Sequence, residues 1–420
     1  MAMGGRIDVL GERGYRRLFL GRTTSLIGDG IAPVAIAFAV LDLTGSTTDL
    51  GLVLAAHGVP ITALVLFGGV VADRVSPRLA MLGADAARAA STGILAALLL
   101  AGVAQVWELA LLYAVDGAAT AFFNPASDAI VPQIVPRERL QQANALLNLS
   151  RALGRVLGPA LAGVLLALGS PGAALAADAA TFTVSAACLL GIRAPRRRPA
   201  GEGEPFLVEM REGWHEFSAR TWLWVVVLGA AVSNAIYFPV IQVLGPTVAK
   251  ASLGGSSAWA LIMTSMGIGA MLGGALALTI RPRRPLLAGE GSIILLTLPV
   301  LLLALPAATV AIAAGALIAG GAGTVAQILY ETVWVQHVPT EALSRVAAYD
   351  WFGSLALEPI GLALIGPLAA GIGISTTLWI AAAALALCWA AVISVPSVRR
   401  LSWGPHRAPR PLLRPVEAGD

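Results

Sequence analysis

Twelve long apolar runs, separated by short polar loops, constrain this chain more than any other feature. A helix needs about 20 apolar residues to cross the hydrocarbon core of a bilayer, and only helices or closed barrels satisfy their backbone hydrogen bonds there. The sequence therefore predicts an all-α polytopic membrane protein. The expected spans are 18–42, 49–72, 78–101, 108–131, 143–168, 171–192, 222–248, 257–280, 285–305, 309–334, 345–370 and 375–397.

The composition excludes most other classes of protein. Charged residues make up 12% of the 420 residues, whereas a soluble domain carries about 25%. So few charges cannot cover a surface in water, and an apolar content of 57% excludes a disordered chain. The sequence has no HExxH pair, nucleophile elbow, phosphate-binding loop or Cys/His cluster, so we expect no enzyme, no ATP-driven pump and no metal. The net charge of +4 comes from loop arginines and gives no reason to expect a nucleic-acid partner.

The arginines alternate from loop to loop. They occur in the N-terminal segment, in the loops after spans 2, 4, 6, 8 and 10, and in the C-terminal tail. The loops after spans 1, 3, 5, 9 and 11 carry no basic residue, and the loop after span 7 carries only Lys250. Basic residues stay on the cytoplasmic side of a membrane. We therefore expect a protein of the cytoplasmic membrane with both termini and the central loop in the cytoplasm.

The central loop divides the chain into two six-span halves. It begins with a Pro/Gly-rich polar stretch and continues with Phe206, Met210, Trp214 and Phe217 at helical spacing, which predicts an amphipathic helix on the inner leaflet. The expected parts are an N-terminal six-helix bundle (1–192), this linker (193–220), a C-terminal six-helix bundle (221–398) and a cytoplasmic tail (399–420).

An internal repeat supports this division. Residues 135–163 and 338–366 align without gaps at an offset of 203 (338 − 135), and nine of the 29 positions are identical, among them Gly158/Gly361 and Gly163/Gly366. The offset corresponds to six spans plus the linker. Two pseudo-symmetric six-helix bundles are the architecture of transporters that rock about a site between their halves.

The loop after span 2 carries a recognisable motif. Gly69, Ala72, Asp73, Arg74 and Arg78 match a signature G-x-x-A-D-R-x-G-R-R/K, and the chain here resembles the major facilitator superfamily. The glycine permits close helix packing, and the aspartate at a helix end can pair with arginine. The resemblance implies a gate that holds the cytoplasmic side closed, with Asp128 of span 4 as the partner of an arginine in this cluster. The alternative is an ordinary basic cytoplasmic turn.

Span 5 carries a second motif. Gly154, Gly158, Pro159 and Gly163 resemble the antiporter motif G-x-x-x-G-P-x-x-G-G of the same superfamily. Proline removes one helix hydrogen bond and bends the helix, while the glycines let another helix approach. The alternative is a general small-residue packing motif. Span 8 offers a matching face in Gly267, Gly269, Gly273 and Gly274.

Residues 15–46 and 124–168 narrow the resemblance. Both segments look like the branch of the superfamily that contains the enterobactin exporter and macrolide efflux proteins. This resemblance implies export of an amphipathic small molecule driven by a proton gradient, with no other cofactor. We expect a monomer in the bilayer.

Three ionisable residues lie near the middle of their spans: Asp29, Arg155 and Glu358. Such residues are expensive in a membrane and are functional candidates by default. We hypothesise that Asp29 or Glu358 takes up the driving proton and that Arg155 adjusts its proton affinity or meets the cargo, because hydration and a nearby guanidinium change the proton affinity of a carboxylate. The alternative is a static ion pair, such as Arg22 with Asp29.

The remaining polar residues in the spans are weaker candidates. Asp85 and Arg88 lie three residues apart and are expected to pair with each other or with the loop cluster, while His57 is expected to be packed or hydrogen-bonded and Asp116 to lie towards the outer end of span 4. Several amide and phenol groups are candidates for lining the cavity, but for each one we favour a hydrogen bond between helices, which contributes ~0.6 kcal/mol. They are Asn124, Asn144, Asn148, Asn234, Tyr237, Gln242 and Gln327.

Three functions remain open from the sequence. The first is an exporter of a drug, antibiotic or siderophore by proton antiport, as in multidrug resistance or siderophore export. The second is a proton-coupled nutrient importer of the same fold. The third belongs to another class: a membrane enzyme, disfavoured by the missing motifs, or a transporter-like sensor.

Overall fold

The computed structural model describes residues 8–74, 76–192, 206–305, 307–339 and 342–403, and for 65–74, 206–210, 212 and 344 it describes the backbone alone. These residues form helices and no strand, and twelve helical segments are long and apolar enough to cross a membrane. The predicted all-α architecture with twelve spans is therefore confirmed.

The first six spans are single helices. The described residues begin with a short 3-10 helix, η2 (Asp8–Gly11), and a second one, η3 (Arg137–Arg139), precedes the fifth span. The spans are α1 (Arg13–Thr44), α2 (Thr47–Arg74), α3 (Pro77–Ala101), α4 (Val106–Ile134), α5 (Leu140–Leu168) and α6 (Pro171–Leu190).

The later spans are more often interrupted. Span 7 consists of α8 (Thr221–Pro239), η4 (Val240–Leu244), α9 (Gly245–Val248) and η5 (Ala249–Leu253), and span 9 of α11 (Pro285–Ile293), η6 (Ile294–Leu296) and α12 (Thr297–Ala304). Span 11 is α14 (Leu343–Leu355) followed by α15 (Glu358–Ile372). The break precedes Pro359, because proline has no N–H to donate and its ring clashes with the carbonyl four residues earlier. The uninterrupted spans are α10 (Ser256–Ala277), α13 (Thr309–His337) and α16 (Ile374–Ser394), which α17 (Pro396–Arg400) follows.

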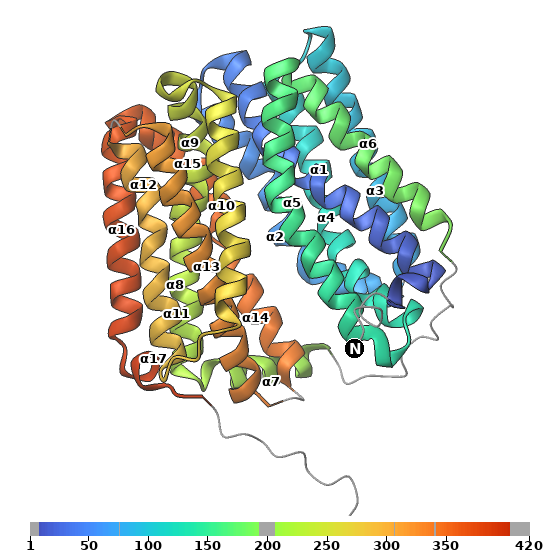
Figure 1. Ribbon diagram of the computed structural model, residues 1–420, viewed down its shortest axis with the longest axis vertical. Helices are drawn as coiled ribbons and strands as arrows, with labels where there is room; N and C mark the ends of the chain where they lie inside the picture. Colours follow the sequence, from blue (N-terminus) through green and yellow to red (C-terminus); the bar gives the residue numbers. More distant parts are fainter. Residues whose placement is uncertain (1–7, 75, 193–205, 306, 340–341, 404–420) are drawn as a thin grey trace, which may run out of the picture.

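The spans pack as two six-helix bundles (Figure 1). In the N-terminal half, α1 packs against α5 and α6, and α4 packs against α2 and α3. In the C-terminal half, α8 packs against α14, α15 and α16, while α13 packs against α10, α11 and α12. The halves join mainly through α5 with α10 and α2 with α15.

The contacts between the halves lie towards one end of the molecule. Gly163 of α5 packs against Ala260 of α10, and Gly366 of α15 packs against Thr47 at the start of α2. This end also holds Lys250 and is called the Lys250 end below; the opposite end, where α7 (Phe206–Ser218) lies, is called the α7 end. From their contact, α5 and α10 diverge towards the α7 end (Figure 1).

Helix α7 packs against α14, a contact that the sequence did not predict. The ring centroids of Trp214 and Phe217 lie 5.6 and 5.9 Å from that of Tyr349 in α14, and Gly213 packs against the side chain of Arg345. Phe217 is buried, whereas 55% of Trp214 is exposed. The neighbouring helix therefore covers part of the apolar face that we assigned to the lipid; the side chains of Phe206 and Met210 lie outside the described residues.

Candidate functional site

A buried arginine organises the interior of the N-terminal half. Arg88 of α3 donates a hydrogen bond from Nε to Oδ1 of Asp116 in α4 at 3.1 Å, and its Nη2 donates to Oδ1 of Asp29 in α1. Its guanidinium also lies 3.9 Å from the ring centroid of Phe182 in α6. Arg88 thus joins three neighbouring helices. The predicted pairing of Arg88 with Asp85 or the loop cluster is wrong, because the guanidinium points across to α1 and α4 instead.

His57 extends this network to α2. Its Nε2 lies 3.1 Å from Oδ2 of Asp116, and its ring stacks on Tyr113 with centroids 4.2 Å apart. The prediction of a hydrogen-bonded histidine is confirmed. The next residue, Gly58, packs against Pro359 of α15, so His57 lies beside the joint between the halves.

A third carboxyl group completes the cluster. Asp178 of α6 is 1% exposed and lies close enough to Arg88, Asp29 and Asp116 to interact with their charges. Its hydrogen-bond partner is the hydroxyl of Thr181 at 3.5 Å. Two carboxylates therefore bind one guanidinium, and a third carboxyl group lies within electrostatic reach of it. We call the side chains of Asp29, His57, Arg88, Asp116 and Asp178 the N-half charge cluster.

The sequence analysis did not single out Asp178, although its position could have been recognised. It is an ionisable residue inside a predicted span, which is a functional candidate by default. Arg88 and Asp116 carried the same signal and were given other roles. Helix rotation decides which of these residues meet, and one sequence does not reveal it.

Arg22 forms a second polar contact on α1. Its Nη2 donates to Oδ1 of Asn124 at 3.1 Å, and its guanidinium lies 4.7 Å from the ring centroid of Phe123. Asp29 receives its hydrogen bond from Arg88. The pair Arg22–Asp29, which the sequence offered as an alternative, is therefore not formed; Arg22 binds Asn124 and Asp29 binds Arg88.

Among the described side chains, Asp128 pairs with Arg151 and not with Arg78 of the loop cluster. Arg151 of α5 donates to Oδ1 of Asp128 at 3.1 Å and to Oδ1 of Asn148 at 2.9 Å. Arg78 instead donates from Nε and Nη2, both at 2.8 Å, to the carbonyl oxygens of Leu189 and Leu190 at the end of α6. A cation there suits the negative end of the helix dipole. The side chains of Asp73 and Arg74 and the surroundings of Gly69 lie outside the described residues.

The glycine motif of α5 serves two contacts. Gly154 lies against Leu26 and Gly158 against Gly30, which brings the backbones of α5 and α1 together around the buried Pro159. Gly163, one helical turn later, meets α10 instead. The motif therefore both builds the N-terminal half and joins the two halves.

The structure does not bring Asp29, Arg155 and Glu358 together. Arg155 is exposed on α5, where its carbonyl oxygen lies against Gly267 of α10. Glu358 begins α15 and receives a hydrogen bond from Gln242. Among the described residues, Arg88 rather than Arg155 is the cation that pairs with Asp29.

Most of the predicted polar cavity residues hold helices together. Asn234 donates to the carbonyl oxygen of Ser354 at 3.0 Å, and the Tyr237 hydroxyl donates to Sδ of Met266 at 3.7 Å. Gln327 donates to Oε1 of Glu331 at 2.7 Å on the exposed surface of α13. The interhelical alternative thus describes Asn234 and Tyr237.

The C-terminal half has its own buried acids, which the sequence analysis did not single out. Glu290 of α11 is 2% exposed and lies within electrostatic reach of Asp350 in α14. The hydroxyl of Tyr330 donates to Oδ1 of Asp350 at 2.5 Å. Among the described residues, no group of three or more His, Cys, Asp or Glu side chains could hold a metal ion.

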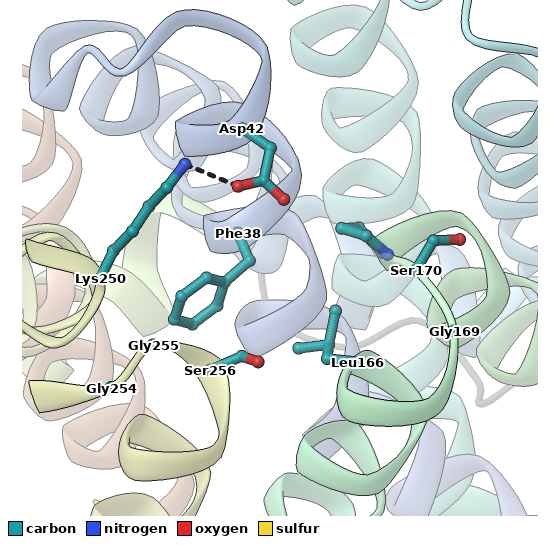
Figure 2. Close-up of a pocket in the computed structure, with 10 residues that line it drawn as sticks. Phe38, Asp42, Leu166, Gly169, Ser170, Lys250, Gly254, Gly255 and Ser256 are labelled. Atoms are coloured by element: carbon teal, nitrogen blue, oxygen red, sulfur yellow. Dashed lines mark hydrogen bonds and ion pairs between the residues drawn. The ribbon is translucent and has the colours of Figure 1, made fainter.

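An ion pair closes the Lys250 end (Figure 2). Nζ of Lys250 lies 2.6 Å from Oδ1 of Asp42 and donates to the carbonyl oxygen of Leu41 at 2.7 Å, which ties η5 of one half to α1 of the other. Beside it lies a cavity of about 460 Å³ between the halves. Its lining includes Phe38, Leu166, Ser170 and Ser256.

Comparisons with known proteins agree with this architecture. The model of the family described as Major Facilitator Superfamily matches residues 18–357. The macrolide efflux protein A of Streptococcus pyogenes is 25% identical over 265 residues, 62% of this chain and 65% of that protein, so the match spans just under two thirds of this relative. The enterobactin exporter of Salmonella choleraesuis (strain SC-B67) is 26% identical over 361 residues, 85% of this chain and 86% of the relative. A mutant of the nucleoside transporter NupG superposes with a TM-score of 0.74 at 13% identity, covering 90% of this chain and 99% of that one.

Proposed function

The chain belongs to the major facilitator superfamily, whose members are transporters and not enzymes, and from this premise we propose that it exports an amphipathic small molecule in exchange for protons. Two relatives are named for efflux of a macrolide and for export of enterobactin, which supports the direction and the cargo class. The single observation that carries proton coupling is the N-half charge cluster.

The charge of that cluster does not balance without protons. Asp29 and Asp116 bind the single guanidinium of Arg88, and Asp178 lies within electrostatic reach of it. An uncompensated buried charge is costly, and a buried group neutralises itself rather than bear that cost. The cluster therefore holds protons, and a change in hydration or in the position of Arg88 changes how many it holds.

The arginine distribution sets the proposed orientation. The positive-inside rule places the α7 end in the cytoplasm together with both termini of the chain. The Lys250 end then faces the outside and is closed, so this conformation is the inward-facing one that receives cargo from the cytoplasm. The closed outer end in turn prevents leakage.

In the proposed exchange of cargo for protons, Asp29 is the proton carrier of the N-terminal half and Glu358 is that of the C-terminal half. Asp29 is 30% exposed and pairs with Arg88, so protonation of Asp29 releases Arg88 to its other partners. Arg155, Asn148 and Gln327 are exposed and are the proposed cargo contacts. We retain the loop after span 2 (Gly69, Asp73, Arg74 and Arg78) as the proposed cytoplasmic gate.

Transport by the purified full chain in proteoliposomes tests this function. With an imposed pH gradient, we expect accumulation of a macrolide, a catecholate siderophore or a hydrophobic cationic dye against its own gradient, and collapse of that accumulation by a protonophore. Asp29→Asn and Glu358→Gln should each abolish proton-driven accumulation while leaving the folded yield unchanged. The control is Glu108→Gln, which removes a charge in the first turn of α4, where the carboxylate accepts from the backbone N–H of Gln105 and not from the cluster.

Full transport by both Asp29→Asn and Glu358→Gln would contradict the assignment of the carriers. Cargo and protons moving in the same direction would instead identify an importer that works by symport.

A further inference from the structure

Four side chains of the N-half charge cluster form one continuous chain of contacts across four helices. His57 of α2 binds one carboxylate oxygen of Asp116, and Nε of Arg88 binds the other. Nη2 of Arg88 then reaches Asp29 on α1. Arg88 is therefore shared between two carboxylates, and one of them is itself shared with an imidazole.

The two ends of this chain are accessible and its middle is not. The side chains of His57 and Asp29 are 24% and 30% exposed, whereas those of Arg88 and Asp116 are 6% and 7% exposed. His57 lies beside the joint of α2 with α15, and Asp29 lies on α1.

The surroundings leave two negative charges unbalanced. The acids are Asp29, Asp116 and Asp178 together with the buried Asp85 of α3, and the permanent cations are Arg88 and Arg22. Tyr113 of α4 is the other titratable group in contact with the cluster. Since His57 is the only further base among these neighbours, protons on carboxyl groups and on the imidazole must supply the missing positive charge.

We propose that His57, Asp116 and Arg88 couple the protonation of Asp29 to the protonation of His57, so that the two ends form a single proton-binding site. This inference rests on the proposed proton exchange and deepens it. A proton on Asp29 removes the charge that holds Nη2 of Arg88, which then turns to Asp116 and displaces the imidazolium. A proton on His57 strengthens its hold on Asp116 and returns Arg88 to Asp29. Arg88 carries no proton from one end to the other; it acts as a positioning residue.

Infrared difference spectroscopy of the purified full chain in detergent tests this coupling without any cargo. The carboxylic acid band of Asp29 is identified as the band that Asp29→Asn removes, and its midpoint pH is measured. We expect His57→Gln to raise that midpoint by about one pH unit, a tenfold change in proton affinity, because without the imidazolium Arg88 turns to Asp116 and releases Asp29. Asp116→Asn, which cuts the same chain at its centre, should shift it as well.

The matched control is His337→Gln in α13. His337 is also half-buried, and its Nδ1 lies 2.9 Å from the carbonyl oxygen of Val333, outside the cluster. This variant should leave the Asp29 midpoint unchanged. Equal midpoints in the wild type, His57→Gln and Asp116→Asn would overturn the coupling even if transport proved proton-driven. A shifted midpoint in a protein that moves no cargo against a pH gradient would instead preserve the site and reject the transport proposal.

Discussion

Gly158 shows how one residue sets the distance between two helices. A Cβ atom added there would lie 2.5 Å from the Cα atom of Gly30, so the backbones of α5 and α1 meet with no room for a side chain. Membrane helices associate by such close packing, because lipid provides no hydrophobic force between them. The position of Asp29, next to Gly30 in the sequence, depends on this contact.

We therefore predict that Gly158→Val destabilises the fold by about 1–3 kcal/mol, the usual cost of forcing extra atoms into a packed interior. The measurement is thermal unfolding in detergent. Gly83→Ala in α3 is the matched control, because nothing lies within 4 Å of a Cβ atom there. An unchanged unfolding midpoint for Gly158→Val would contradict the close contact.

At this scale the sequence predicted candidate residues but not their partners. Asp29 followed from its depth in a span and His57 from its chemistry. The bonds from Arg88 to Asp29 and Asp116 could not be predicted, because they depend on how α1, α3 and α4 are rotated about their own axes. Periodicity in spans that are apolar on all sides carries little information about that rotation.

At the scale of a single helix, the two faces of α10 pack against different halves of the molecule. Gly267 packs against the carbonyl oxygen of Arg155 in α5, while Gly269 and Gly273 pack against α13 of its own half. The stripe of glycines was evident in the sequence. The sequence did not show which glycines of the stripe contact α5 and which contact α13, because both contacts require only a small residue.

We predict that Gly267→Leu separates α5 from α10 at the Lys250 end. A Cβ atom there would lie 2.5 Å from the Arg155 carbonyl oxygen, which is backbone and cannot move aside. Spin labels are placed at Leu168 and Ser257 in a protein whose Cys188 and Cys388 are replaced by serine. Double electron–electron resonance should report a longer distance between the two labels in Gly267→Leu than in the wild type. Gly274→Leu is the control on the same helix, since its nearest neighbour is Thr324 of the same half at 3.9 Å. Identical distance distributions in wild type and Gly267→Leu would refute the prediction.

The whole molecule is held in one conformation by contacts at one end. The apolar runs predicted its twelve spans, and the repeat predicted its two bundles. Both predictions were possible because the length of a span and the duplication of a segment can be read directly from the sequence. Which end is closed depends on contacts far apart in sequence, such as Asp42 with Lys250. No local sequence pattern predicts these contacts.

We predict that Lys250→Met raises the population open at the Lys250 end by about 1.5- to 5-fold, because an exposed ion pair contributes about 0.2–1 kcal/mol. Spin labels at Thr44 and Ser252 in the serine-substituted protein would measure that population. The double variant Asp42→Lys with Lys250→Asp should restore the wild-type distribution by exchanging the charges. Failure of the exchange to restore it would show that the pair does not act through its charges.

Lys250 is the sole lysine in the 420-residue sequence, so the chain presents one side-chain amine to an acylating reagent. That amine is half of the bond between η5 and α1, and acylation removes its positive charge. Reactivity of the unaltered protein therefore reports how often the bond opens. A single round of amine labelling, followed by mass spectrometry of the peptide around Lys250, therefore measures how often the Lys250 end opens, without an engineered probe.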